Sequence, residues 1–286
     1  MQRLELRRKS RLDPASLVLE PYRRDVTSQN GEDGIIERIF EIVGTANKWC
    51  VEFGAWDGKL YSNTWNLIAN HGWTGLLIEG SRERFEDLRR TYADLPQRTH
   101  LVNRFVTLDP GARLDDLMHE AGAPEDCDLV SIDIDGNDWH IWNSLQRFRP
   151  RVVVIECNPS IENDIYFVQD YGRSINHASS MLALIELGKS KGYELIASTG
   201  GNGLFVRREL FGAFGIADNS IDALHDSSDH VIKIFQGFDG TIFAAGDLKL
   251  HWHGIPLSQE DFQVLRPIDR RFPGTRRRRW WRRLRE

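Results

Sequence analysis

The sequence predicts an α/β protein with a mostly parallel sheet. Apolar runs of strand length alternate with amphipathic runs of helix length between residues 33 and 191, as in a parallel sheet with crossover helices. The run at 151–157 is largely β-branched, which is typical of a central parallel strand. Beyond residue 192 the runs YELIAS and GLFVRR, separated by TGGNG, predict an antiparallel hairpin. We therefore expect seven strands, of which the last two form that hairpin.

Each element has its own local support. The first helix, 33–43, places Ile35, Ile36 and Ile39 on one stripe and ends at Gly44. The other helices are expected at about 63–70, at 82–93, at about 113–120, from near Asn137, and at about 179–191. The strands are expected at 49–53, 75–79, within 99–107, at 128–133, at 151–157 and in the two runs of the hairpin. The short runs HVIKIF, TIFAAG and LKLHWH predict a β-rich addition at 211–274.

Charge is unevenly distributed over the 286 residues. Five Lys/Arg against one Glu give residues 1–12 a charge of +4, and seven Arg against one Glu give residues 276–286 a charge of +6. The formal net charge of −5 therefore leaves −15 for residues 13–275. An acidic body argues against a protein whose main surface tracks the phosphates of duplex nucleic acid.

The Arg/Trp-rich tail, 275–286, is a candidate contact to an anionic membrane surface or to nucleic acid. The alternatives are pairing with an acidic patch of the same chain and disorder, which is common in such charge runs.

Other classes are disfavoured by composition. The chain has no apolar run of about 18 residues, so no transmembrane helix is expected, and its first residues lack the apolar stretch of a secretory signal. Cys50, Cys127 and Cys157 are too few and too scattered for a disulfide framework or a zinc site. We expect buried, reduced thiols in a cytoplasmic protein.

A nucleotide-type site is predicted where the first two strands end. Gly54 and Gly58 in VEFGAWDG allow a tight turn and a close approach of the backbone to a ligand. The next helix begins near residues 62–64, whose N–H groups we expect to be free for an anion. Glu79, at the end of the second strand, can accept both ribose hydroxyl protons. The pattern fits S-adenosylmethionine or NAD, and the absence of G-x-G-x-x-G disfavours NAD.

A second polar cluster follows strands four and five, in SIDIDGNDWH and VIECNPS. Adjacent parallel strands should bring Asp133, Asp135, Glu156 and Asn158 to one crevice. Oxygen ligands of this kind suit Mg²⁺, with Asp135, Glu156 and Asn158 as candidate ligands. The same groups can instead orient a cofactor ammonium or a substrate hydroxyl, or cap the helix that starts near Asn137.

Candidate general bases lie in the same segment. A methyl transfer to oxygen needs a proton acceptor near the nucleophile. The candidates are Asp133, Asp135, Asp138 and His140. His140 has the natural pKa for this role, but a histidine one turn into a helix is also commonly packed or solvent-facing.

Six segments together resemble the FkbM-like S-adenosylmethionine-dependent methyltransferases. They are SQNGEDGIIERIF (28–40), VEFGAWDGKLYSNTWNL (51–67), GWTGLLIEGS (72–81), SIDIDGNDWHIW (131–142), VVVIECNP (152–159) and ASSMLALIELGKSKGYELIASTGGNGLFVR (178–207). The resemblance implies a class I methyltransferase fold, Rossmann-like, with S-adenosylmethionine as cofactor. Where the family commonly has an IDVEG-type ending to strand four, this chain has IDIDG, with a shorter acid.

The resemblance also assigns roles to residues. It implies that Glu52, Gly54 and Asp57 line the methionine end of the cofactor, held also by Ser62 and Asn63. It implies that Glu79 binds the ribose and that Asn103 lies near the adenine. Asp133 and Asp135 would face the reacting centre, with Asp133 also touching the cofactor, whereas His140 matches no fixed family position.

These observations predict four parts and one activity. The parts are a basic extension at 1–27, a methyltransferase domain at 28–210, the β-rich addition at 211–274 and the tail at 275–286. The expected activity, within EC 2.1.1, is O-methylation of a sugar or natural-product-like small molecule. The alternatives are N-methylation of a small amine and a binding module without turnover.

Three further segments carry open alternatives. In SQNGEDG, Gln29 and Glu32 can reach the cofactor pocket, or the segment is a capped helix start. The segment 161–180 is loop-like and can shape the acceptor pocket, with Tyr166, Tyr171 and His177 as the residues to test. The motif HWH, 251–253, puts two histidines on one side of an expected strand, a weak indication of zinc.

Overall fold

The computed structural model describes residues 12–172, 174–227 and 230–272. These residues fall into two compact units, of which the first ends at Asp226 and the second begins at Ser227. Each unit has its own sheet structure.

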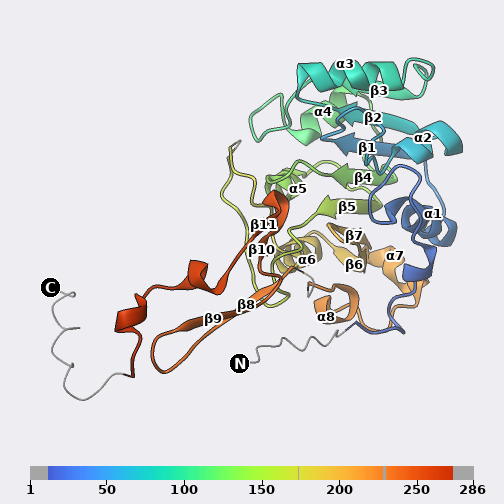
Figure 1. The fold of residues 1–286 in the computed structure, drawn as a ribbon. Helices are drawn as coiled ribbons and strands as arrows, with labels where there is room; N and C mark the ends of the chain where they lie inside the picture. The colour runs from blue at the N-terminus through green and yellow to red at the C-terminus, as the bar shows by residue number, and fades with distance from the viewer. Residues whose placement is uncertain (1–11, 173, 228–229, 273–286) are drawn as a thin grey trace. The chain divides into compact units, whose positions relative to one another are not determined.

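The first unit contains a seven-stranded sheet in the order β3-β2-β1-β4-β5-β7-β6 (Figure 1). Its strands are β1 (Trp49–Phe53), β2 (Thr74–Ile78), β3 (Thr99–Val102), β4 (Leu129–Ile132), β5 (Val152–Glu156), β6 (Tyr193–Ser198) and β7 (Asn202–Arg207). Strands β1 to β5 pair in parallel, and β7 pairs antiparallel with both β5 and β6. This order, with an antiparallel β7, is the class I methyltransferase topology, so the predicted fold is confirmed.

Helices connect these strands. They are α1 (Glu32–Val43), α2 (Trp65–His71), α3 (Arg82–Thr91), α4 (Leu114–Glu120), α5 (Asp138–Ser144), α6 (Met181–Ser190), α7 (Arg208–Phe211) and α8 (Ile221–Leu224), with short 3₁₀ turns η1 (Glu20–Tyr22) and η2 (Gly212–Phe214). Six of the helices lie within about two residues of their predicted positions. Helices α7 and α8 were not predicted, because four residues are too few for a periodic pattern.

The core has two apolar layers, one on each face of the sheet. Residues of the strands alternate between them because successive side chains point to opposite faces. Val51 and Phe53 pack with α4, α5 and α6, whereas Cys50 packs with α1, α2 and α3. All three cysteines are buried and free, as predicted. The result is a three-layer α/β/α unit in which helices cover both faces of the sheet.

The division between the units differs from the expected one at residue 210. Phe214, Ile216 and Leu224 are buried in the core of the sheet unit. His225 Nδ1 lies 2.6 Å from the Ser198 hydroxyl of β6. At the other end, Leu19 is buried in the same core, although we expected residues 1–27 to be an extension. Short apolar contacts of this kind leave no periodic signal in a sequence.

The second unit is built from two small hairpins. Strands β8 (Ile232–Gln236) and β9 (Ile242–Gly246) form one, and β10 (Lys249–Leu250) and β11 (Ile255–Pro256) form the other. Short 3₁₀ turns complete it: η3 (His251–His253), η4 (Gln259–Phe262) and η5 (Pro267–Asp269). The expected strand over HWH was wrong, because these three residues form η3.

Two further predictions concern membrane-spanning helices and the basic C-terminal tail. Among the described residues, no helix is both long and apolar enough to cross a membrane. The Arg/Trp-rich tail, 275–286, lies outside the described residues.

Gly54 offers a test of the sheet geometry. Its φ is +76°, and a Cβ there would lie 1.9 Å from the Asp133 carbonyl oxygen. Gly44 has a φ of +65° and nothing within 4 Å of its Cβ position. Gly44 also has a ψ of 170°, a conformation that essentially only glycine adopts, so Gly44→Ala should lower the free energy of unfolding by about 1–3 kcal/mol, the backbone cost alone. Gly54→Ala should cost about 1–3 kcal/mol more, because the strands must also move apart. Urea unfolding of both variants checks this, and equal losses would contradict it.

Candidate functional site

The loop after β1 leaves backbone exposed at the carboxyl edge of the sheet. Gly54 is exposed, and its N–H and that of Ala55 both donate to the Ile78 carbonyl at the end of β2, at 3.1 and 3.2 Å. These bonds bend the chain sharply after β1. Because a side chain at residue 54 would meet Asp133, only glycine fits this turn.

Glu52 is buried and fully engaged by the next segment of the loop. Its carboxylate accepts hydrogen bonds from the Ser62 hydroxyl at 2.6 Å, the Thr64 hydroxyl at 2.8 Å and the Asn63 N–H at 2.8 Å. Burial raises the pKa of Glu52 to about 7, against the lowering effect of these bonds. Glu52 thus holds residues 62–64 in place beneath the edge.

The expected free N–H groups at the start of α2 are not found. The Asn63 N–H donates to Glu52, and the Thr64 and Trp65 N–H groups donate to the Ser62 hydroxyl oxygen, at 3.2 and 2.9 Å. The Asn63 side chain donates to the Ser131 hydroxyl of β4 at 3.1 Å. Ser62 and Asn63 therefore brace the site, and an anion at this point would have to displace internal bonds.

Glu79, for which the sequence predicts a ribose contact, faces the glycine loop. Its two oxygens accept hydrogen bonds from the Trp56 N–H at 2.9 Å and the Ser81 N–H at 2.6 Å. The Asn103 side chain donates to the Glu79 carbonyl oxygen at 2.8 Å. A carboxylate has about four acceptor positions, so two remain for hydroxyl donors.

Asp57 closes its own turn. One carboxylate oxygen accepts from the Lys59 and Leu60 N–H groups, at 2.9 and 2.8 Å. Its backbone carbonyl accepts from the Thr91 hydroxyl of α3 at 2.6 Å. The structure thus gives Asp57 a role in shaping the loop, whatever further contact it makes to a ligand.

The predicted acidic cluster forms at the ends of β4 and β5. Carboxylate oxygens of Asp133, Asp135 and Glu156 all lie within 4.8 Å of one another. The Asp135 N–H donates to Glu156 at 3.0 Å. Alternation of side chains along a strand does not place Asp135 here, because β4 ends at Ile132 and Asp135 has a φ of +56°. A left-handed turn, rather than strand geometry, returns Asp135 to the cluster.

Burial and the charges of neighbouring carboxylates raise the pKa values of two members of the cluster, Glu156 and Asp133. Burial, and then the charges of Asp133, Asp138 and Asp135, raise the pKa of Glu156 to about 10. Burial and the Asp135 charge raise the pKa of Asp133 to about 6, although a hydrogen bond with Glu156 opposes this. The cluster therefore holds a proton more tightly than separate carboxyl groups would, and the pKa of Glu156 is raised the most.

Asp138 is buried and holds the loop between β4 and α5. Its oxygens accept from the Ile134 N–H at 2.9 Å and the Gly136 N–H at 2.8 Å. Burial, and then the Asp133 charge, raise the pKa of Asp138 to about 7. Of the four candidate bases, this one is enclosed by the chain. Its oxygens hold the loop before α5 and do not cap the helix, whose N-cap residue is Asn137 with no side-chain cap bond.

Asn158 is engaged away from the carboxylates. Its side-chain oxygen accepts from both the N–H and the hydroxyl of Ser160, at 2.9 and 2.6 Å. Its amide nitrogen donates to the His177 carbonyl at 2.8 Å. Of the three predicted metal ligands, Asp135 and Glu156 lie in the acidic cluster, whereas Asn158 fixes the loop after β5.

His140 also anchors that loop. Its Nε2 lies 2.8 Å from the Gln169 carbonyl oxygen, so this nitrogen carries the proton and donates it. Its ring packs edge-on against Tyr171, with ring centroids 5.6 Å apart. The Nε2 of His140 is therefore unsuited to accept a proton from a substrate in this arrangement.

Gln169 organises the loop and was missed by the sequence analysis. Its side-chain oxygen accepts from the His177 and Ala178 N–H groups, both at 2.9 Å, and its amide donates to the Ile175 carbonyl at 3.0 Å. Only its burial marks it, and a lone glutamine in a polar segment gives no sequence signal. Tyr166 and Tyr171, which were predicted as pocket residues, are 52% and 41% exposed.

Exposed apolar side chains gather on loops after the strands. Among the described residues of the sheet unit, all but two of the large exposed ones follow β1, β3 or β5. They are Trp56, Leu60, Tyr61, Phe105, Ile165, Tyr166, Phe167 and Tyr171. Such grouping at one edge of a sheet is typical of a surface that binds a partly apolar ligand. We call these eight residues the apolar rim.

The SQNGEDG segment forms a packed helix start. Glu32 is buried and accepts hydrogen bonds from the side chains of Thr199 and Asn202, next to the β6–β7 turn. Ser28 accepts from the Asp33 N–H at 3.1 Å, while Gln29 is exposed. The segment is therefore a packed helix start, but no side chain caps it, because the N-cap position is held by Gly31 and not by Ser28 or Asn30.

Comparison with known proteins supports the fold and the resemblance. Residues 107–195 match the model of the methyltransferase FkbM domain family. The resemblance inferred from sequence is thus confirmed over these residues, which run from the loop after β3 through the acidic cluster and the loop after β5 into β6. Fold and family match together support a S-adenosylmethionine-dependent methyltransferase. No curated protein matches the chain.

Solved structures resemble the chain at low identity. A SAM-dependent methyltransferase from Aquifex aeolicus is 10% identical, with a TM-score of 0.40, over 68% of this chain and 98% of that one. A methyltransferase from Geobacter sulfurreducens is 14% identical, with a TM-score of 0.40, over 68% and 88%. The CMeT domain of the citrinin polyketide synthase is 11% identical, with a TM-score of 0.40, over 62% of this chain and 51% of that one. The chain thus spans about half the length of that last structure, and the strand order alone defines the fold.

The acidic cluster predicts an unusual pH dependence of stability. A carboxyl whose pKa is raised by folding binds protons more tightly in the folded state than in the unfolded state. Its contribution to the free energy of unfolding therefore falls as the pH rises from the unfolded-state pKa to the folded-state pKa. For Glu156 this interval runs from its ordinary 4.5 to about 10. Glu156→Gln keeps the shape and an acceptor for Asp135, and should make the free energy of unfolding less dependent on pH above about pH 5.

The measurement is urea unfolding between pH 5 and pH 9 in EDTA. The matched control is Glu86→Gln on α3, whose side chain is 55% exposed. Glu156→Gln should gain stability relative to the parent as pH rises, while Glu86→Gln should follow the parent curve. Parallel curves for all three proteins would contradict the account of the cluster.

Proposed function

We propose that this chain transfers a methyl group from S-adenosylmethionine to a hydroxyl of a sugar or natural-product-like small molecule. The observation that carries the proposal is the carboxyl edge of the sheet, where the Gly54 turn, Glu79 and the acidic cluster lie on neighbouring strands. Ligands of open α/β sheets bind at this edge. The match to the FkbM domain family supports the reaction class.

The cofactor would lie over β1 and β2. Glu79 keeps two acceptor positions for the ribose hydroxyls, and Gly54 leaves the backbone open beneath the sugar and the methionine end. Phe105 follows Asn103, and its ring lies against the Cα of Gly80, where it offers an apolar face to the adenine. Glu52, Ser62 and Asn63 act from below by holding the loop that shapes this pocket.

The acceptor would lie over β4 and β5. Asp133 is half-buried beside Gly54 and, with a pKa of about 6, is ionised at neutral pH, so it can accept the proton of an acceptor hydroxyl. The protonated Glu156 beside it can donate a hydrogen bond to the same acceptor. Most of the rate enhancement would come from holding methyl donor and hydroxyl in line. The rim residues after β5, from Ile165 to Tyr171, would bind the less polar face of the acceptor.

N-methylation and assistance by a magnesium ion are the two alternatives to this mechanism. N-methylation of an amine needs no strong base, so it would tolerate loss of Asp133. A magnesium ion would be held by Asp133, Asp135 and Glu156, whose three carboxylates are the donor set that Mg²⁺ prefers. A cation would have to displace the Glu156 proton. This favours a role in which the carboxyl cluster orients the acceptor hydroxyl without a metal ion.

The first prediction concerns Glu79. Glu79→Gln should weaken binding of S-adenosylhomocysteine at least about 10-fold, because a charge-assisted pair of ribose bonds is lost. Calorimetry measures the affinity, and Glu83→Gln on α3 is the control. An analogue without ribose hydroxyls should bind the parent and Glu79→Gln equally well. If both ligands lose affinity to the same degree, Glu79 shapes the loop and does not bind the ribose.

The second prediction separates base, metal and binding module. Asp133→Asn should lower turnover about 100-fold or more, with a smaller loss of S-adenosylhomocysteine affinity. Turnover by the parent should persist in EDTA, and His140→Gln should retain it. The measurement is S-adenosylhomocysteine release across a panel of hydroxyl and amine acceptors. Turnover that survives Asp133→Asn would favour N-methylation, loss in EDTA restored by Mg²⁺ would favour the metal, and cofactor binding without any turnover would favour the binding module.

A further inference from the structure

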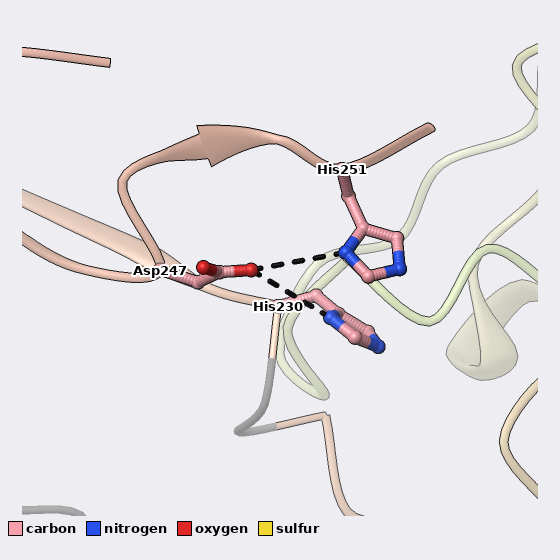
Figure 2. Close-up of side chains that lie close together, drawn as sticks. All are labelled: His230, Asp247 and His251. Carbon is pink, nitrogen blue, oxygen red and sulfur yellow. Dashed lines mark ion pairs between the residues drawn. The ribbon is translucent and has the colours of Figure 1, made fainter. Parts of the chain in front are cut away.

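The second unit brings two histidines and an aspartate together (Figure 2). The Nδ1 atoms of His230 and His251 lie 3.9 and 3.8 Å from the same Asp247 carboxylate oxygen. The two imidazole rings are 4.0 Å apart between centroids. One ligand atom from each residue lies within 4.8 Å of the others. We call these three residues the His₂Asp cluster.

Backbone geometry fixes the positions of the cluster. In the β8–β9 hairpin Ile232 pairs with Gly246, and the Asp247 N–H continues the ladder by donating to the Val231 carbonyl at 3.3 Å. Gly246 has a φ of +121°, and a Cβ there would lie 2.1 Å from that carbonyl oxygen. This glycine therefore permits the close crossing that sets Asp247 beside His230.

His251 reaches the cluster from the next turn. The Lys249 N–H donates to the Asp247 carbonyl at 2.7 Å, which folds the chain back directly after Asp247. His251 then opens η3, four residues after Asp247. The three side chains thus come from three separate positions. His230 lies just before β8, Asp247 lies just after β9, and His251 opens η3.

We propose that the His₂Asp cluster binds a divalent transition metal ion, with Zn²⁺ as the preferred ion. Two imidazole nitrogens and one carboxylate oxygen form a donor set that zinc commonly takes, with a fourth position for water or another ligand. Bond lengths of about 2.0 Å and tetrahedral angles put ligand atoms about 3.3 Å apart. The observed 3.8 and 3.9 Å need only small side-chain rotations to reach this geometry. His230 Nδ1 is buried and has no hydrogen-bond partner, so it is available as a ligand.

The composition of the second unit gives the metal a structural role. Among its described residues only Val231 and Ala244 are buried apolar side chains. Small units with so little core usually need a disulfide, a metal or a partner to stay folded. A bound ion would join the β8–β9 hairpin to η3 and hence to the β10–β11 hairpin. It would do so independently of the proposed methyl transfer.

The motif HWH pointed to zinc through the wrong pair. A 3₁₀ turn has about three residues per turn, so His251 and His253 point in different directions. The structure pairs His251 with His230, which lies 21 residues earlier in the sequence. His253 therefore serves as a matched control: it lies in the same turn and outside the cluster.

The experiment uses the full chain without an affinity tag. The protein is stripped with EDTA and titrated with Zn²⁺ by calorimetry, and with Co²⁺ by visible absorption, which reports tetrahedral coordination. We expect one ion per chain in the parent and in His253→Gln. His230→Gln, His251→Gln and Asp247→Asn should each weaken binding at least about 10-fold, because each loses a direct ligand.

A second readout separates the cluster from the acidic edge of the sheet. Zn²⁺ should protect the 230–257 segment from limited proteolysis in the parent and in His253→Gln, and should not protect it in His251→Gln. Asp135→Asn in the sheet unit should leave this protection unchanged. Zinc binding that survives the His230 and His251 substitutions, or a parent that binds no Zn²⁺ or Co²⁺, would overturn the proposal.

Discussion

The close approach of β1 and β4 is the constraint on which the carboxyl edge depends. Gly54 follows β1 directly, and its missing side chain lets the Asp133 backbone come within reach of the β1 turn. That approach puts the proposed cofactor surface beside the acidic cluster. The same turn presents the Trp56 N–H to Glu79, so the acid after β2 is aimed by the glycine loop. A methyl donor and its acceptor can share one edge only if these strand ends stay close.

Several carboxyl groups are buried at this edge of the sheet. Glu52 and Asp138 are enclosed, and each uses its oxygens to hold a loop. Asp133 and Glu156 lie close together at the ends of β4 and β5, and burial and mutual repulsion raise the pKa of both. Such an arrangement lowers the free energy of unfolding of the free protein at higher pH. It also gives two neighbouring carboxyl groups perturbed pKa values, as is common at functional sites. Glu52 and Asp138 thus have structural roles, and Asp133 and Glu156 form the proposed acid–base pair.

The fold was predictable from sequence, and part of the site was not. Periodicity reports burial, so strands such as Trp49–Phe53 and the alternating layers followed directly. It does not report where a carboxylate points. Glu52 and Glu79 both follow apolar runs, yet the oxygens of Glu52 are taken up by residues 62–64, while Glu79 keeps acceptor positions. Gln169 and the pairing of His230 with Asp247 depend on loop paths and hairpin register, which leave no local pattern.

The central claim is that the carboxyl edge over β1, β2 and β4 binds S-adenosylmethionine. Ultraviolet cross-linking of the radiolabelled cofactor to the full chain, followed by peptide mapping, tests it most directly. The account predicts label on peptides containing residues 54–61, 79–81 or 103–105, displaced by S-adenosylhomocysteine. Label confined to residues 230–272, or no displaceable label, would contradict it.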